Sequence, residues 1–120
     1  MGERDPPPDS APASPRAAFE RMLAAGKDGA LLRYSLGNEC LKAGDAAAAA
    51  VHLAAATRHD PRYTAAWKLL GKALEASGRD ADALVAWQRG VEVARLRGDK
   101  QAEKEMTVFA RRVEKRAAPG

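Results

Sequence analysis

Residues 63–78 read Y-T-A-A-W-K-L-L-G-K-A-L-E-A-S-G, which is the pattern of one amphipathic helix. Trp67, Leu70, Gly71 and Leu74 follow one another at intervals of three, one and three residues, so they share one helical face. A glycine inside a helix costs about 1 kcal/mol relative to alanine. We therefore predict that Gly71 lets a second helix approach so closely that no side chain fits between the two.

The same pattern recurs 34 residues earlier in the chain. A shift of 34 residues also carries Trp87 onto Leu53 and, one step further back, onto Phe19. The chain therefore contains two copies of one unit and part of a third. The other matched pairs are Leu70 with Leu36, Gly71 with Gly37, Leu74 with Cys40, Gly78 with Gly44, and Ala83 with Ala49.

This period, with W-x-x-L-G in one helix and A-x-x-x-W in the next, resembles the tetratricopeptide repeat. The resemblance covers residues 16–116 and is typical of small bacterial repeat proteins. It implies an all-α solenoid of antiparallel helix pairs, with about six helices and a right-handed superhelical twist. For function, it implies a non-enzymatic protein–protein interaction module, such as an adaptor.

The chain divides into a short tail and one domain built of repeats. The tail, residues 1–14, is rich in proline and poor in apolar side chains, a composition typical of disorder. A length of 120 residues suits a single domain. The predicted domain covers residues 15–117, with capping helices at 15–25 and 100–116, repeat one at 30–63 and repeat two at 64–97.

Local signals predict where the helices begin. Ser14 before Pro15 is an N-cap followed by proline at the first helical position. Asp28, Asp45 and Asp80 are the candidate N-caps of three helices in the two repeats. These helices are expected over about residues 29–43, 46–59 and 82–96.

The last helix, about residues 100–116, departs from the 34-residue period because that count places charged side chains at core positions. A count of 35 instead gives an apolar stripe of Ala102, Met106, Phe109 and Val113. We therefore predict one inserted residue in the preceding turn and a capping helix whose stripe faces inward. The chain would then be a monomer. The alternative is an exposed stripe that pairs two chains into a homodimer.

The composition excludes several classes of protein. No run of about 18 apolar residues exists, so we expect no transmembrane helix and no membrane contact. The first residues lack the apolar core of a signal peptide, so we expect a cytoplasmic protein. The single cysteine, Cys40, cannot form an internal disulfide and is expected to be buried.

No catalytic motif is present in the sequence. His52 and His59 are seven residues apart on one predicted helix, which separates them by about 10 Å. No cysteine or second carboxylate accompanies them on that face, and the glycines do not have phosphate-loop spacing. We therefore expect no enzymatic activity, no metal and no cofactor.

The family resemblance implies a binding groove. In tetratricopeptide repeats, the first helices of successive repeats line a concave surface that holds extended peptides or helices. Three ammonium groups, a carboxamide and a phenol on this surface suit an acidic segment, or one that ends in a carboxylate. The alternative is that these are ordinary solvated positions. The candidate residues are Tyr34, Asn38, Leu41 and Lys42 in repeat one and Lys68, Lys72 and Glu75 in repeat two.

The positive charge of the chain is concentrated at its C-terminal end. Residues 95–116 contain eight Lys or Arg and four Asp or Glu, a net +4 that equals the formal charge of the whole chain. An alternative function is therefore the binding of a polyanion or nucleic acid by the basic last helix. Acidic residues alternate with the basic ones there and no exposed aromatic residues are expected, which disfavours nucleic acid.

Overall fold

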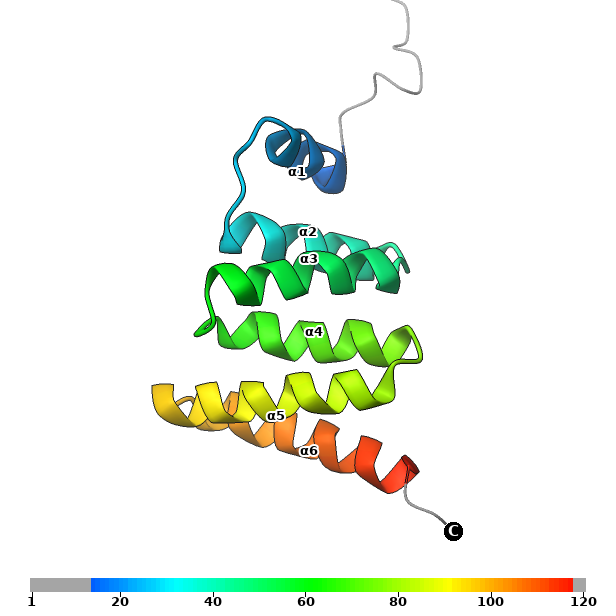
Figure 1. Cartoon of the computed structure of the whole chain (residues 1–120), viewed down its shortest axis with the longest axis vertical. Helices are drawn as coiled ribbons and strands as arrows, with labels where there is room; N and C mark the ends of the chain where they lie inside the picture. The colour runs from blue at the N-terminus through cyan, green and yellow to red at the C-terminus, as the bar shows by residue number, and fades with distance from the viewer. Residues whose placement is uncertain (1–13, 118–120) are drawn as a thin grey trace, which may run out of the picture.

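The computed structural model describes residues 14–117, and this part of the chain forms six α-helices stacked in sequence order (Figure 1). Each helix packs against the next one along the chain. The prediction of an all-α solenoid with six helices is confirmed. The proposed tail lies outside the described residues, except for Ser14. The helices are α1 (Pro15–Ala24), α2 (Ala30–Lys42), α3 (Ala46–His59), α4 (Thr64–Ala76), α5 (Asp80–Arg97) and α6 (Lys100–Ala117).

Two helices begin at the predicted caps. The hydroxyl oxygen of Ser14 accepts a hydrogen bond from the amide of Ala17 at 3.2 Å, and Pro15 is the first residue of α1. The carboxylate of Asp45 accepts a hydrogen bond from the amide of Ala48 at 3.2 Å. Each oxygen satisfies a backbone donor that has no partner inside its own helix.

The prediction that Asp28 caps α2 is wrong. Gly29 holds the N-cap position, and the Asp28 carboxylate accepts hydrogen bonds from Arg33 Nε at 2.8 Å and Nη2 at 3.0 Å. A bidentate bond to a guanidinium is stronger than one bond to a backbone amide. This contact lowers the pKa of Asp28 to about 2. Asp28 therefore ties the connection between α1 and α2 to the first turn of α2.

The prediction that Asp80 caps α5 is also wrong. Arg79 holds the N-cap position, and Asp80 is the first residue of the helix, which begins two residues before the expected start. The Asp80 carboxylate accepts a hydrogen bond from Arg116 Nη2 at 3.0 Å. A carboxylate in the first turn is also stabilised by the helix dipole, so Asp80 is favourable there without acting as a cap.

Glycines bring the helices of each pair into close contact. A Cβ atom added at any of three helical glycines would lie less than 3.0 Å from a side chain of the following helix. Real Cβ atoms do not approach other atoms so closely, so only glycine fits. The prediction for Gly37 and Gly71 is confirmed, and a third glycine, Gly90, acts in the same way. The pairs are Gly37 with Leu53, Gly71 with Trp87 and Gly90 with Met106.

The 35-residue register of the last helix is confirmed for three of its four predicted residues. Ala102, Met106 and Val113 are buried, and Met106 lies against Gly90 of α5. Phe109 is only partly buried, because the neighbouring Ala110 occupies the core position in its place. Ala102, Met106 and Val113 of the apolar stripe are therefore covered within one chain.

Candidate functional site

Alternate helices form one continuous surface. α2 contacts α4 and α4 contacts α6, in addition to the contacts between sequence neighbours. We call this surface the inner face. It contains the predicted groove residues of α4 and further residues of α6 that the sequence analysis did not assign to a groove. The inner face consists of Tyr34, Asn38 and Leu41 on α2, Tyr63, Lys68, Lys72 and Glu75 at the start of and along α4, and Glu105, Phe109, Arg112 and Arg116 on α6.

Two tyrosines form the aromatic part of the inner face. The rings of Tyr34 and Tyr63 stack with their centroids 4.9 Å apart and their planes inclined by 25°. Burial raises the pKa of Tyr63, and the neighbouring Tyr34 raises it further. Both side chains are half-buried, so this end of the inner face presents two partly exposed aromatic rings. Tyr34 was predicted from the sequence, whereas Tyr63, which precedes the helix, was not.

The other predicted residues of α2 differ in burial and in their partners. Leu41 packs partly against the hydrophobic core, and Asn38 is half-buried. Lys42 is exposed, and its Nζ donates a hydrogen bond to Glu39 Oε2 on its own helix at 3.1 Å. Lys42 is therefore held on α2 and is not grouped with Lys68 and Lys72.

Ion pairs connect α4 to α6. Lys68 Nζ lies 3.5 Å from Glu105 Oε1, so the first predicted cation of α4 already has a partner. Glu75 is paired with Arg116 at 3.0 Å and with Arg112 at 3.6 Å. Two of the three predicted groove residues of α4 are therefore partly neutralised by the last helix.

Lys72 differs from its neighbours on α4. It is exposed and forms no ion pair with any residue in the described range, 14–117. Its Nζ lies 5.3 Å from the centroid of the Phe109 ring, within the range of a cation–π contact. Arg112 Cζ lies 5.4 Å from the same centroid, and Trp87 packs against the ring at 5.3 Å. Lys72 and Arg112 thus both lie near the half-buried ring of Phe109.

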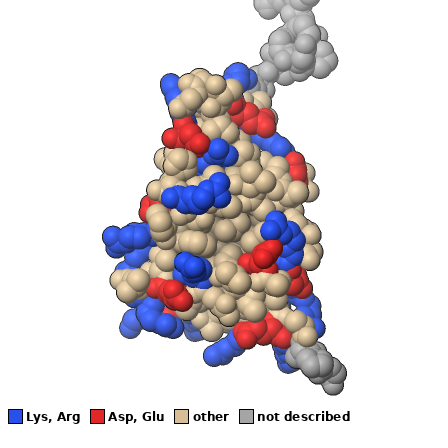
Figure 2. Space-filling view, viewed as in Figure 1, with Lys and Arg blue, Asp and Glu red and all other residues tan. Residues whose placement is uncertain are grey.

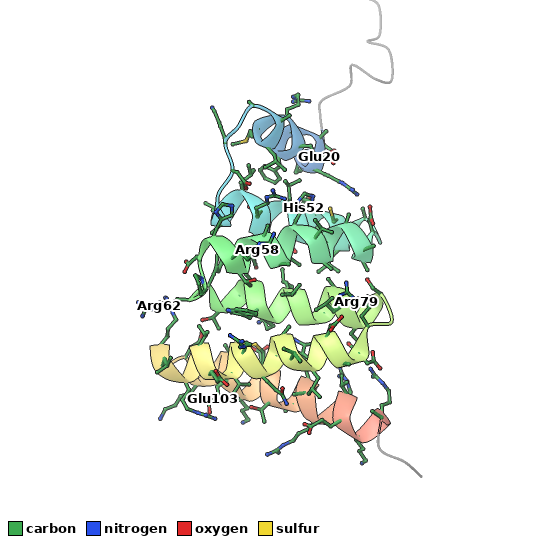
Figure 3. The ribbon with its side chains drawn as sticks, viewed as in Figure 1. Glu20, His52, Arg58, Arg62, Arg79 and Glu103 are labelled. Atoms are coloured by element: carbon green, nitrogen blue, oxygen red, sulfur yellow. The ribbon has the colours of Figure 1, made fainter. Side chains whose placement is uncertain are left out.

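The view in Figures 2 and 3 shows a different surface. Figure 2 shows a mostly uncharged area at the centre of this face, with charged side chains around it. A hollow of about 340 Å³ lies there between α3 and α5, with Leu70 and Leu74 of α4 among its lining residues. Arg58 and Arg79 lie at its two ends (Figure 3). The predicted groove residues do not line this hollow.

The part of the chain that the structure describes contains neither a cluster of metal ligands nor a membrane-spanning helix. Between residues 14 and 117, no three His, Cys, Asp or Glu side chains are close enough together to hold a metal ion. None of the six helices in that range is long and apolar enough to cross a membrane. Cys40 is buried, as predicted, and burial raises the pKa of its thiol.

Comparison with known proteins gives consistent matches. A family model described as tetratricopeptide repeat matches residues 41–97. A TPR repeat-containing protein of Pseudomonas aeruginosa is 55% identical over 97 residues, which cover 81% of this chain and 92% of that protein. The solution structure of a Bordetella parapertussis protein has a TM-score of 0.73 and 42% identity, covering 87% of this chain and 90% of that one. A tetratricopeptide repeat domain protein from Salinibacter ruber has a TM-score of 0.70 and 28% identity, covering 78% and 94% of the two chains.

Proposed function

The chain belongs to the tetratricopeptide repeat family, and from this premise we propose that it is a non-enzymatic module whose inner face binds a segment of a partner protein. Tetratricopeptide repeat domains generally bind proteins. The proposed ligand is a peptide or helix that carries at least one carboxylate beside an apolar side chain. The inner face would bury the apolar side chain of the ligand and form an ion pair with its carboxylate.

The observation that carries the proposal is the position of Lys72 over Phe109. Lys68 and Glu75 have partners on α6, whereas Lys72 has no carboxylate partner among residues 14–117. A carboxylate that reaches Lys72 would also lie beside Arg112, because both cations contact the same ring. An exposed ion pair contributes only about 0–1 kcal/mol, so the charges would mainly set the orientation of the ligand.

Apolar contacts would supply most of the affinity. The stacked rings of Tyr34 and Tyr63 and the half-buried ring of Phe109 are the aromatic groups on the inner face. Aromatic side chains are enriched at the residues that dominate binding energy in protein interfaces. A segment that crosses α2, α4 and α6 would meet the tyrosines first and Phe109 last.

A polyanion is less well supported as the ligand. Three of the eight basic residues between 95 and 116 are paired with carboxylates in the structure, namely Arg95, Arg112 and Arg116. The aromatic ring in this segment, Phe109, is partly covered by Trp87. Nucleic acids favour open aromatic rings for base stacking and unpaired cations for their phosphates.

The test compares two variants with the same change of charge. A natural partner would first be isolated on the immobilised protein, and its dissociation constant measured by calorimetry. Lys72→Glu should weaken binding by about tenfold or more, because it repels the ligand carboxylate. Lys27→Glu, at an exposed position between α1 and α2, should leave the dissociation constant within about twofold. Equal binding by both variants, with unchanged circular dichroism, would rule out Lys72 as a contact.

A further inference from the structure

α6 has three sides, and only two of them are covered. One side packs on α5, and a second contacts α4. The third side faces solvent at the end of the stack, beyond which the described chain has no further helix (Figure 1). We call it the outer side of α6. It is formed by Lys100, Lys104, Thr107, Val108, Arg111 and Lys115.

The position of α6 in the stack resembles that of α4, but one neighbour is missing. α4 packs between α3 and α5, whereas α6 packs on α5 and has no helix after it in the described range. The outer side of α6 is therefore the place where one more helix would extend the solenoid.

The outer side contains two hollows. A hollow of about 410 Å³ is lined by residues between Lys100 and Arg111, and one of about 320 Å³ by residues between Gln101 and Phe109. Both hollows share Lys104 and Val108. The Val108 side chain is 53% exposed at the centre of the helix, so it offers apolar surface between the two hollows.

The charge around Val108 is positive and unpaired. Among residues 14–117, no carboxylate lies within 4.0 Å of the charged groups of Lys100, Lys104, Arg111 and Lys115. The acid nearest to them along the first hollow, Glu103, is paired with Arg95 at 3.1 Å. Glu103 marks this end of the stack in Figure 3. The inner side of the same helix is different, because Glu105, Arg112 and Arg116 there are paired with residues outside α6.

We propose that the outer side of α6 is a second docking surface and that its occupant is an acidic amphipathic helix of a partner protein. An apolar ridge on that helix would pack over Val108 and Thr107. Asp or Glu residues beside the ridge would pair with Lys104 and Arg111. This interaction is separate from the proposed function, because Lys104, Val108 and Arg111 do not belong to the inner face, although Glu105 and Phe109 of that face also line the second hollow.

A helix fits the outer side better than a nucleic acid does. Val108 adds an exposed apolar side chain beside the cations, which an apolar residue of a helix can cover and a phosphate backbone cannot use. Phe109, the aromatic residue that lines the second hollow, is packed against Trp87, so its ring is not open for base stacking. Helix-on-helix packing also continues the arrangement of the preceding five helices.

The probe is a synthetic helical peptide of the length of α6, with Leu along one face, Glu on both flanks and Ala elsewhere. Binding is followed by the methyl resonances of Val108 during titration into the full chain. The expected result is a saturating shift of these resonances, and no shift with a peptide in which every Glu is replaced by Lys. Lys104→Glu combined with Arg111→Glu should weaken binding by about tenfold or more, and Val108→Asp, followed by the methyl resonance of Thr107 instead, should do the same. Lys72→Glu on the inner face should leave binding within about twofold.

Five results would overturn the proposal. The first is no shift of Val108 at any concentration of the Glu peptide. The second is unchanged binding by the Lys104→Glu and Arg111→Glu variant, which changes only exposed side chains and should fold normally. The third is tighter binding of a DNA duplex than of the peptide at the same salt concentration. The fourth is a Val108 shift that depends on protein concentration alone, which would show that a second copy of the chain is the occupant. Loss of peptide binding in Lys72→Glu would move the site to the inner face instead.

Discussion

Trp87 lies directly over Gly71, and its indole Nε1 donates a hydrogen bond to the carbonyl oxygen of Lys68 at 3.1 Å. The indole is fully buried, so this bond satisfies a polar group that would otherwise have no partner. One side chain of α5 therefore fixes both the distance and the register of α4. It also supports the inner face from below, because the same indole packs against Phe109.

Replacement of Gly71 by leucine should destabilise the domain. The new side chain would overlap the Trp87 indole, and overpacking of this kind typically costs about 1–3 kcal/mol. The free energy of unfolding would be measured by urea denaturation followed by circular dichroism. Ala76→Leu, at an exposed position of the same helix, is the matched control and should change it by less than about 0.5 kcal/mol. An unchanged midpoint for Gly71→Leu would contradict the close contact between α4 and α5.

The loss of stability caused by substitutions in α6 should increase with the burial of the replaced side chain. Met106→Ala should cost about 2–5 kcal/mol, because Met106 is fully buried against Gly90. Phe109→Ala should cost less than Met106→Ala, since part of the ring is exposed. Arg112→Ala should change the free energy of unfolding by less than about 0.5 kcal/mol, because its pair with Glu75 is exposed and long. A cost for Arg112→Ala as large as that for Met106→Ala would refute the 35-residue register.

Stability should fall between about pH 7 and pH 5 because of His52. Arg33 can only donate hydrogen bonds, so the Nδ1 atom of His52, 3.1 Å from Arg33 Nη1, must accept one and carry no proton. Burial lowers the pKa of His52, and the charges of Arg33 and Arg16 lower it further. The unfolded chain, with an ordinary histidine pKa of about 6.5, then binds more protons than the folded chain as the pH falls.

The His52→Gln variant isolates this effect. Its thermal midpoint should fall less than that of the unmodified chain when the pH is lowered from about 7.5 to about 5.5, the interval around the ordinary histidine pKa. The comparison cancels contributions from carboxylates, which both proteins share. Parallel midpoint curves for the two proteins would show that His52 is not kept neutral by the fold.

The sequence predicted the features that depend on repetition. Gly37 and Gly71 stand 34 residues apart in equivalent surroundings, so the close contact of one implied the close contact of the other. The contact of Gly90 with Met106 was not predicted, because it joins the last repeat to a helix outside the 34-residue period.

The features that depend on residues distant in sequence were not predicted. Asp80 is a residue type that often caps helices, but its carboxylate accepts a hydrogen bond from Arg116, which is 36 residues away. Glu75 and Lys68 looked available for a ligand, but α6 supplies them with partners. Phe109 and Ala110 are adjacent apolar residues, and only packing against α5 decides which of the two is buried. The sequence therefore predicted which residues of α4 share one face, whereas only the structure shows that Lys68 and Glu75 are paired with α6 and Lys72 is not.

The most direct test of the central claim is the binding footprint of an isolated partner segment. Side-chain and amide resonances of the full chain would be assigned and compared with and without a saturating concentration of the partner segment. We expect the largest changes at Tyr34, Lys72 and Phe109 on the inner face. Changes confined to Val51 and Val85, the exposed valines of α3 and α5, would contradict the assignment of the inner face as the binding surface.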